Sequence, residues 1–204
     1  MRPESAEALA EAVGVSRETA ARWQIHHDLL LRWAPKLNLV AASTLAAVWT
    51  RHFADSAQLW AHGGGRHWLD LGSGAGFPGL VLAAMAPPGT HVTLIEADAR
   101  KTVFLNTVIR EAALPAEVHR SRIEALAPRD ADTITARAVA PLDRLLALAH
   151  PHLAAEGQCL FPKGARAESE LTAAARGWHY RLDRLPDRVD PAGIILRLSE
   201  IARA

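Results

Sequence analysis

The chain has 204 residues, half of them hydrophobic, and a formal net charge of +1 at pH 7. This length suits one domain, with or without a small appendage, and the composition supplies enough apolar residues for a sizeable core. The near-neutral charge neither indicates nor excludes a nucleic-acid partner, the single cysteine excludes an internal disulfide framework, and no apolar run is long enough to span a membrane.

The first 62 residues are predicted to form a helical extension. Three stretches have the caps and the apolar spacing typical of helices: about 4–13, 16–34 and 43–61. The run His62-Gly63-Gly64-Gly65 then marks the boundary to a part with a different pattern. We therefore divide the chain into an extension of residues 1–62 and a core of residues 63–204.

A glycine-rich stretch dominates the core. Residues 70–79 read DLGSGAGFPG and lie between the short apolar run 67–69 and the helix-like run 80–85. Strand, glycine turn and helix is the order that a nucleotide-binding loop needs, because glycine lets the backbone approach a ligand and the helix start offers free N–H groups. We expect Pro78 in the first turn of that helix, where its missing N–H costs nothing.

This loop can be aligned with two cofactor classes. Gly74, Gly76 and Gly79 fit the spacing of a dinucleotide fold, but the first glycine then lies four positions after the strand's Asp70. The other register is Asp70-x-Gly72-x-Gly74-x-Gly76, with the acid at the end of the strand. That register is typical of methyltransferases that use S-adenosylmethionine, and Asp70 would receive the methionine ammonium directly or through water.

The rest of the core alternates strands and helices. Further strands are predicted over 91–95, 116–119, 132–135, 157–161, 178–183 and 193–198. Helices are predicted over 98–113, 141–149 and 165–175, with Val103, Phe104, Thr107 and Val108 facing inward on the first. The pattern predicts an α/β fold with a mainly parallel, doubly wound sheet of seven strands and an antiparallel strand from the terminal hairpin.

Three further positions follow strand ends, where open α/β sheets bind ligands. Glu96 ends the second strand, where an acid accepts bonds from a nucleotide ribose in both cofactor classes. Ile123 follows the third strand and is placed to pack on an adenine ring. Arg137 follows the fourth strand and is predicted to be functional.

Several kinds of methyl acceptor can be set aside. The fourth strand is followed by Ala136-Arg137-Ala138-Val139 rather than by the Asn/Asp-Pro-Pro-aromatic turn used on exocyclic amines. Cys159 lies within a predicted strand, so we interpret it as a buried small hydrophobic residue rather than a nucleophile. A ring nitrogen with a free lone pair needs only positioning, with an Arg or Lys to hold a nearby oxygen or phosphate.

The histidines are scattered along the chain. The closest pairs are His26-His27 and His150-x-His152, and neither has a second cluster with metal-ligand spacing. We place both pairs at the surface or at helix ends and predict no metal site.

Taken together, these blocks carry a resemblance to a known family. The blocks are Asn38-Leu39, Arg51-His52-x-x-Asp55-Ser56, residues 70–79, Lys101, Ser121-Arg122-Ile123-Glu124, Arg137-Ala138 and Lys163-Gly164. In this order, from about residue 20 to the C-terminus, the chain resembles the bacterial small-subunit ribosomal RNA methyltransferase G family, also called glucose-inhibited division protein B.

The resemblance implies a class I, Rossmann-like methyltransferase that uses S-adenosylmethionine to methylate guanine N7 in the 530 loop of 16S ribosomal RNA. It implies cofactor contacts at Gly72, Phe77, Ile123, Glu124 and Arg137, in addition to Asp70, Gly74, Gly76 and Glu96 from the loop pattern. It also makes Arg137, His52 and Lys163 candidate catalytic residues, and Arg51, Lys101 and Lys163 candidate RNA-binding residues.

Two other hypotheses remain open at this point. One is a methyltransferase of another RNA or a small molecule on the same fold, and the other is a non-enzymatic module that binds nucleotides or RNA. We expect a cytoplasmic monomer whose partner is 16S ribosomal RNA or the small ribosomal subunit, without a membrane. Convergence of the predicted cations on one face of the protein would favour a ribosomal RNA methyltransferase over these two hypotheses.

Overall fold

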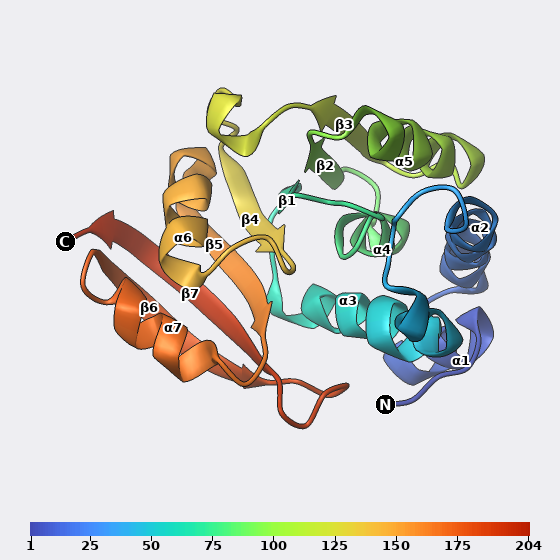
Figure 1. The fold of residues 1–204 in the computed structure, drawn as a ribbon, viewed down its shortest axis with the longest axis horizontal. Helices are drawn as coiled ribbons and strands as arrows, with labels where there is room; N and C mark the ends of the chain where they lie inside the picture. The colour runs from blue at the N-terminus through green and yellow to red at the C-terminus, as the bar shows by residue number, and fades with distance from the viewer.

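The computed structural model describes residues 1–204, built around one seven-stranded sheet in the order β3-β2-β1-β4-β5-β7-β6 (Figure 1). The strands are β1 (His67–Leu71), β2 (His91–Glu96), β3 (Ala116–Arg120), β4 (Ala131–Ala136), β5 (Leu153–Lys163), β6 (Trp178–Pro186) and β7 (Ile194–Arg203). All pairs are parallel except those of β7, which runs antiparallel to β5 and to β6. The predicted seven-stranded, mainly parallel sheet is confirmed.

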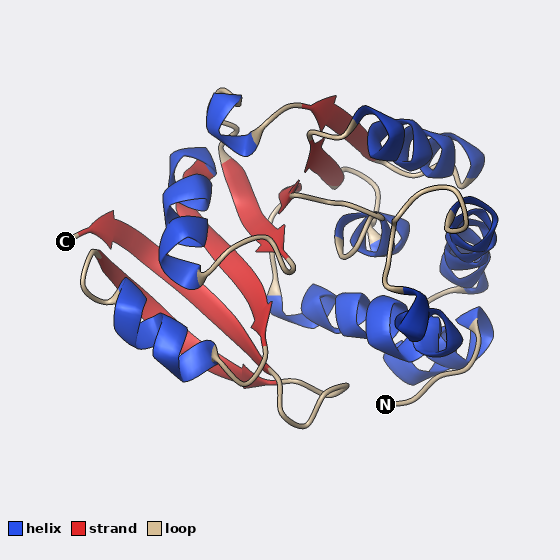
Figure 2. Ribbon diagram, viewed as in Figure 1, coloured by secondary structure: helices blue, strands red, loops and turns tan.

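Helices cover both faces of this sheet (Figure 2). The helices are α1 (Ala6–Val13), α2 (Arg17–Trp33), α3 (Asp55–Ala57), α4 (Gly79–Met85), α5 (Ala99–Glu111), α6 (Leu142–Ala149) and α7 (Ala167–Ala174). The N-terminal helices lie beside α4 and α5, whereas α6 and α7 pack together on the other side (Figure 1). The connection from β3 to β4 holds only one short turn, Ile123–Ala125.

Alternation along the strands divides the apolar side chains between two clusters. In β1, Trp68 packs into the cluster under α2, α4 and α5, while Leu69 and Leu71 pack into the cluster under α6 and α7. A strand that is buried on both faces is apolar at successive positions, and the central parallel strands have this sequence pattern. Cys159 is fully buried among these residues, as predicted.

The helical extension shares the first of these clusters with the core. Leu9, Trp23 and Phe53 lie in it together with Leu80 and Phe104. The Trp23 indole also donates a hydrogen bond to the carbonyl of Val81, at 3.1 Å. No helix of the protein combines the length and the apolar character that crossing a bilayer requires.

The predicted helix over 43–61 is wrong as a single element. The chain forms a 3₁₀ turn (Ala42–Ala47), a π-helical turn (Trp49–Ala54), α3, and a second 3₁₀ turn (Gln58–His62). The carbonyl of Arg51 accepts a hydrogen bond from Arg137, so tertiary bonding competes here with the regular helical ladder. Such wide turns often occur at functional sites.

Three smaller predictions are also wrong. His26 is buried in the middle of α2, although spacing placed it at the surface or at a helix end, whereas His150 and His152 do lie at the helix end that follows α6. Val103 is 56% exposed instead of facing inward. Pro78 precedes α4 as its N-cap rather than lying in its first turn.

Candidate active site

The glycine loop follows β1 and turns back under strong conformational constraint. Gly72, Gly74 and Gly76 have φ of 68°, 56° and 87°, a region that other residues rarely adopt. A Cβ on Gly72 would lie 2.8 Å from Cγ2 of Val139, so the loop also packs closely against the segment after β4. Glycine is required here both for the turn and for this close approach.

The side chain of Asp70, in β1, is hydrogen-bonded to β4 and to the last residue of the glycine loop. Its carboxylate is buried, with Oδ1 accepting from the Thr135 hydroxyl at 2.9 Å and Oδ2 from the N–H of Gly79 at 3.3 Å. Burial raises the pKa of Asp70 to about 6, although these hydrogen bonds oppose the shift. The contact of Asp70 with a methionine ammonium, directly or through water, stays a prediction. In the structure its carboxylate joins β4 to the start of α4 through these two bonds.

Glu96 connects the loop to β2. Its Oε2 accepts from the N–H of Gly74 at 2.9 Å and its Oε1 from the N–H of Asp98 at 2.8 Å. A carboxylate has about four acceptor positions, so these two bonds leave capacity for further donors. Glu96 lines a cavity of about 600 Å³ together with residues that follow β2 and β3: Ala97, Asp98, Ala99, Arg120, Ser121 and Arg122.

Ile123, predicted beside the adenine, and Glu124, predicted as a cofactor contact, follow this lining in the sequence. Ile123 and Glu124 form the short turn between β3 and β4, where Ile123 is partly buried. The carboxylate of Glu124 is 3.3 Å from the Arg144 guanidinium. Neither Ile123 nor Glu124 lines the smaller cavity, although Arg122, the residue before them, does.

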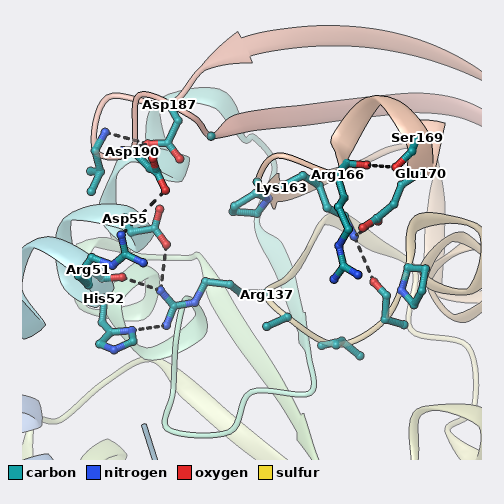
Figure 3. A pocket seen from close by; sticks show the side chains of 18 of the residues that line it. Arg51, His52, Asp55, Arg137, Lys163, Arg166, Ser169, Glu170, Asp187 and Asp190 are labelled. Carbon is teal, nitrogen blue, oxygen red and sulfur yellow. Dashed lines mark hydrogen bonds and ion pairs between the residues drawn. The ribbon is translucent and has the colours of Figure 1, made fainter. Parts of the chain in front are cut away.

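A larger cavity of about 820 Å³ opens beside Arg137 (Figure 3). Nη1 of Arg137 donates to Oδ2 of Asp55 at 2.9 Å and to the carbonyl of Arg51 at 3.1 Å, and Nη2 donates to Nδ1 of His52 at 2.8 Å. Figure 3 shows these residues gathered on one wall of the cavity. The segment around residues 51–55 therefore fixes the guanidinium at the carboxyl end of β4.

The contacts of His52 define its protonation. Because Arg137 can only donate, Nδ1 of His52 is an acceptor, which puts the ring proton on Nε2. Nε2 then donates to the Thr44 hydroxyl at 2.8 Å, and that hydroxyl donates to the carbonyl of Ala41. Burial, followed by the charges of Arg137 and Arg51, lowers the pKa of His52 to about 4. With this lowered pKa, His52 is neutral at pH 7.

Phe77 is enclosed by aromatic rings. Its ring stacks on His52 and on His26, with centroids 5.0 Å and 4.9 Å away, and the Arg137 guanidinium lies 5.2 Å from its centroid. His26 also donates from Nε2 to the carbonyl of Ala75 at 2.8 Å. The Phe77 side chain is buried, so a cofactor contact at this position can come only from its backbone.

Lys163 leaves the end of β5 on the opposite wall. Its Nζ is 2.8 Å from Oε2 of Glu170 and donates to the carbonyl of Ala140 at 3.1 Å. Glu170 accepts in turn from the N–H of Leu142 at the start of α6. The pair is mostly buried and holds the segment between β4 and α6 in place.

The structure thus brings together four of the predicted residues and separates one. Arg51, His52, Arg137 and Lys163 line the larger cavity. Lys101 lies on the first turn of α5 and lines neither cavity, so its RNA-binding role stays a prediction. We find no group of histidine, cysteine or acidic residues that could hold a metal ion.

Sequence reasoning missed three residues of the site. Asp55 was part of a quoted motif but received no role, and His26 was assigned to the surface. Arg166, at the start of α7, also lines the larger cavity. The only feature of the sequence that could have indicated Arg166 is that it is a cation three positions after Lys163.

The sheet order, with a glycine loop after β1 and an acid ending β2, defines the class I methyltransferase fold. Solved structures agree. A methyltransferase dependent on S-adenosylmethionine from Aquifex aeolicus superposes with a TM-score of 0.59 at 14% identity, covering 79% of this chain and 94% of that one. M. jannaschii TYW2 in complex with AdoMet gives 0.57 at 16% identity, covering 76% and 78%.

The family follows from sequence comparison. The model of the GidB family, described as rRNA small subunit methyltransferase G, matches residues 20–183. Relatives named ribosomal RNA small subunit methyltransferase G are 53% identical in Rhodospirillum centenum, covering 94% of this chain and 88% of the relative, and 50% identical in Paramagnetospirillum magneticum, covering 97% and 96%. The chain belongs to this family, and the resemblance seen in its motifs is confirmed.

Proposed function

We propose that this protein transfers the methyl group of S-adenosylmethionine to N7 of a guanine in 16S ribosomal RNA. The observation that carries the proposal is the family match over residues 20–183. That range contains the glycine loop, Glu96 of the smaller cavity, and Arg51, Arg137 and Lys163 of the larger one.

The residues of the smaller cavity suit the cofactor. The positive-φ glycines leave room beside the loop, and Glu96 keeps free acceptor positions for ribose hydroxyls. Backbone groups of Gly72 and Phe77 would hold the methionine end, and Ile123 and Glu124 the adenine. When bound, the cofactor supplies a methyl group on a positively charged sulfur.

The larger cavity suits a guanine acceptor. N7 carries a lone pair, so the protein need not remove a proton, and in-line positioning supplies much of the rate. Arg137 would donate to O6 of the base, the oxygen that arginine commonly binds on guanine. Methylation leaves a positive charge on the ring, and the neutral state of His52 avoids adding repulsion there.

Several finer features belong to the same proposal. The target guanine lies in the 530 loop, within free 16S ribosomal RNA or the small ribosomal subunit. The protein acts as a monomer in the cytoplasm, where ribosomal subunits are assembled. Residues 1–62 and 63–204 fold as one unit, which the shared hydrophobic cluster supports.

The test is to map N7-methylguanine in 16S ribosomal RNA from cells that lack this protein. We expect one site to lose its methyl group, and the wild-type gene, but not an Arg137→Ala gene, to restore it. An unchanged methylation map would refute the proposal. Labelled cofactor that binds, without any RNA fraction accepting the methyl group, would favour a small-molecule methyltransferase or a non-enzymatic module.

A further inference from the structure

The charged side chains of the larger cavity are mostly neutralised from within. Its cations are Arg51, Arg137, Lys163 and Arg166, and its carboxylates include Asp55, Glu170 and Asp190. Arg137 is paired with Asp55 at 2.9 Å, Lys163 with Glu170 at 2.8 Å, and Arg51 lies 3.9 Å from Asp190. A cation already held by a buried carboxylate has little capacity left for a phosphate.

Arg166 differs from the other three cations. Its guanidinium has no hydrogen bond and no carboxylate within 4.0 Å, and the residue is exposed. Its backbone is fixed, since its carbonyl accepts from the Ser169 hydroxyl at 2.8 Å and from the N–H of Glu170 at 3.0 Å. A free cation on a fixed backbone is suited to a ligand from outside the protein.

The position of Arg166 indicates which part of the ligand it meets. In Figure 3, Arg166 lies with Lys163 and Glu170 on one wall, and Arg51 lies on the other wall together with the Arg137 guanidinium. Arg51 is also accessible, with a side chain 58% exposed. A nucleotide that inserts its base toward Arg137 would leave its flanking phosphates near the two exposed arginines.

We infer that Arg166 binds a backbone phosphate of the RNA substrate, on the wall opposite Arg51. The inference rests on the proposed function and deepens it. It also changes the role predicted for Lys163, which positions the segment after β4 instead of binding RNA. Arginine matches a phosphate with two parallel hydrogen bonds, and the attraction is independent of sequence.

The experiment compares Arg166→Ala with Arg176→Ala, an exposed arginine just after α7 that does not line the cavity. Methylation of small ribosomal subunits from cells lacking the modification is measured over a range of KCl concentrations. We expect Arg166→Ala to raise KM severalfold with little change in kcat, and to reduce the slope of log(kcat/KM) against log[KCl] by about 1. Arg176→Ala should match the wild type.

Two further variants separate phosphate binding from structural effects. Arg166→Lys keeps the charge and should retain the wild-type salt slope. Lys163→Met should lower kcat without changing that slope. Calorimetric affinity for S-adenosylmethionine should be the same in Arg166→Ala and the wild type, which shows that the fold is intact.

The outcomes distinguish the two proposals. Wild-type KM and salt slope in Arg166→Ala, or equal losses in Arg166→Ala and Arg176→Ala, would overturn the role of Arg166 and leave the methyltransferase function standing. A wild-type protein that methylates no ribosomal RNA would overturn the function, and this inference with it.

Discussion

Asp55 and Arg137 form an ion pair that joins the helical extension to the end of β4. The atoms Oδ2 and Nη1 are 2.9 Å apart, between residues separated by 82 positions in the sequence. The two side chains are only 16% and 19% exposed. Breaking one side of such a buried pair leaves an uncompensated charge, so the pair constrains both residues.

Asp55→Asn should separate the orienting role of this pair from its packing. The amide keeps an oxygen acceptor of similar size but loses the charge that fixes the guanidinium. We expect the single-turnover rate of methyl transfer to fall about tenfold, because small displacements of a positioning group are costly in rate. Affinity for S-adenosylmethionine should change less.

The control for Asp55→Asn is Asp143→Asn, which removes a carboxylate that lines the same cavity and makes no ion pair. Equal rates in the two variants would show that Asp55 does not orient Arg137.

Arg137→Ala should lower methyl transfer by more than tenfold while the fold survives. The variant leaves Asp55 without its cation, and the cost of a broken buried pair is about 3 kcal/mol or more. Arg137→Lys is therefore measured beside it, since lysine keeps a charge near Asp55 but cannot reach both Asp55 and His52. A folded Arg137→Lys protein with wild-type turnover would refute the role of the guanidinium.

Gly74→Val should abolish binding of S-adenosylmethionine. A Cβ on Gly74 meets nothing closer than the Gly72 carbonyl oxygen at 3.9 Å, so the protein itself has room for it and the intrusion falls on the ligand side. The backbone strain is controlled by Gly89→Val, which also has positive φ and no neighbour within 4 Å of its Cβ. Calorimetry should show lost binding in the first variant and normal binding in the second.

His26→Phe should change the pH dependence of stability. Burial lowers the pKa of His26 to about 4, whereas an unfolded histidine titrates near 6.5. The native state is therefore favoured above pH 6.5, and about 3 kcal/mol of that preference is lost as the pH falls from 6.5 toward 4. Phenylalanine keeps a ring against Phe77, but it loses both the titration and the bond to the Ala75 carbonyl.

The measurement for His26→Phe is urea unfolding at pH 7.5 and at pH 5. We expect the variant to be less stable than the wild type at pH 7.5, and the gap to shrink at pH 5. Asp70, whose raised pKa has the opposite effect, is present in both proteins and cancels in the difference. A gap that stays constant with pH would contradict this account of His26.

The sheet could be predicted from the sequence because its signals are local. The central strands β1, β2 and β4 are short and mostly apolar, most turns between elements carry glycine or proline, and residues 70–79 join strand, turn and helix in one stretch. The end of β2 also marked Glu96 without reference to any distant residue. Such local sequence patterns are enough to predict the number of strands and the carboxyl edge of the sheet, where the cavities lie.

The missed features depend on partners far along the chain. His26 contacts Ala75 and Phe77, about fifty positions away, so its helical spacing could not distinguish a buried histidine from an exposed one. Residues 43–61 have the composition of a helix, yet they fold into separate 3₁₀, π-helical and α-helical turns, and the Arg51 carbonyl within them bonds to the distant Arg137. Asp70 was identified correctly as the acid at the strand end, but the direction of its side chain depends on Thr135.

The lining of the larger cavity extends from Thr44 near one end of the sequence to Gly193 near the other. Ribosomes synthesise the chain from its N-terminus, so the glycine loop emerges long before the last wall of this cavity exists. A nascent chain therefore passes through a stage with its nucleotide loop complete and its acceptor surface unfinished. The larger cavity is therefore complete only when residues up to Gly193 have been synthesised.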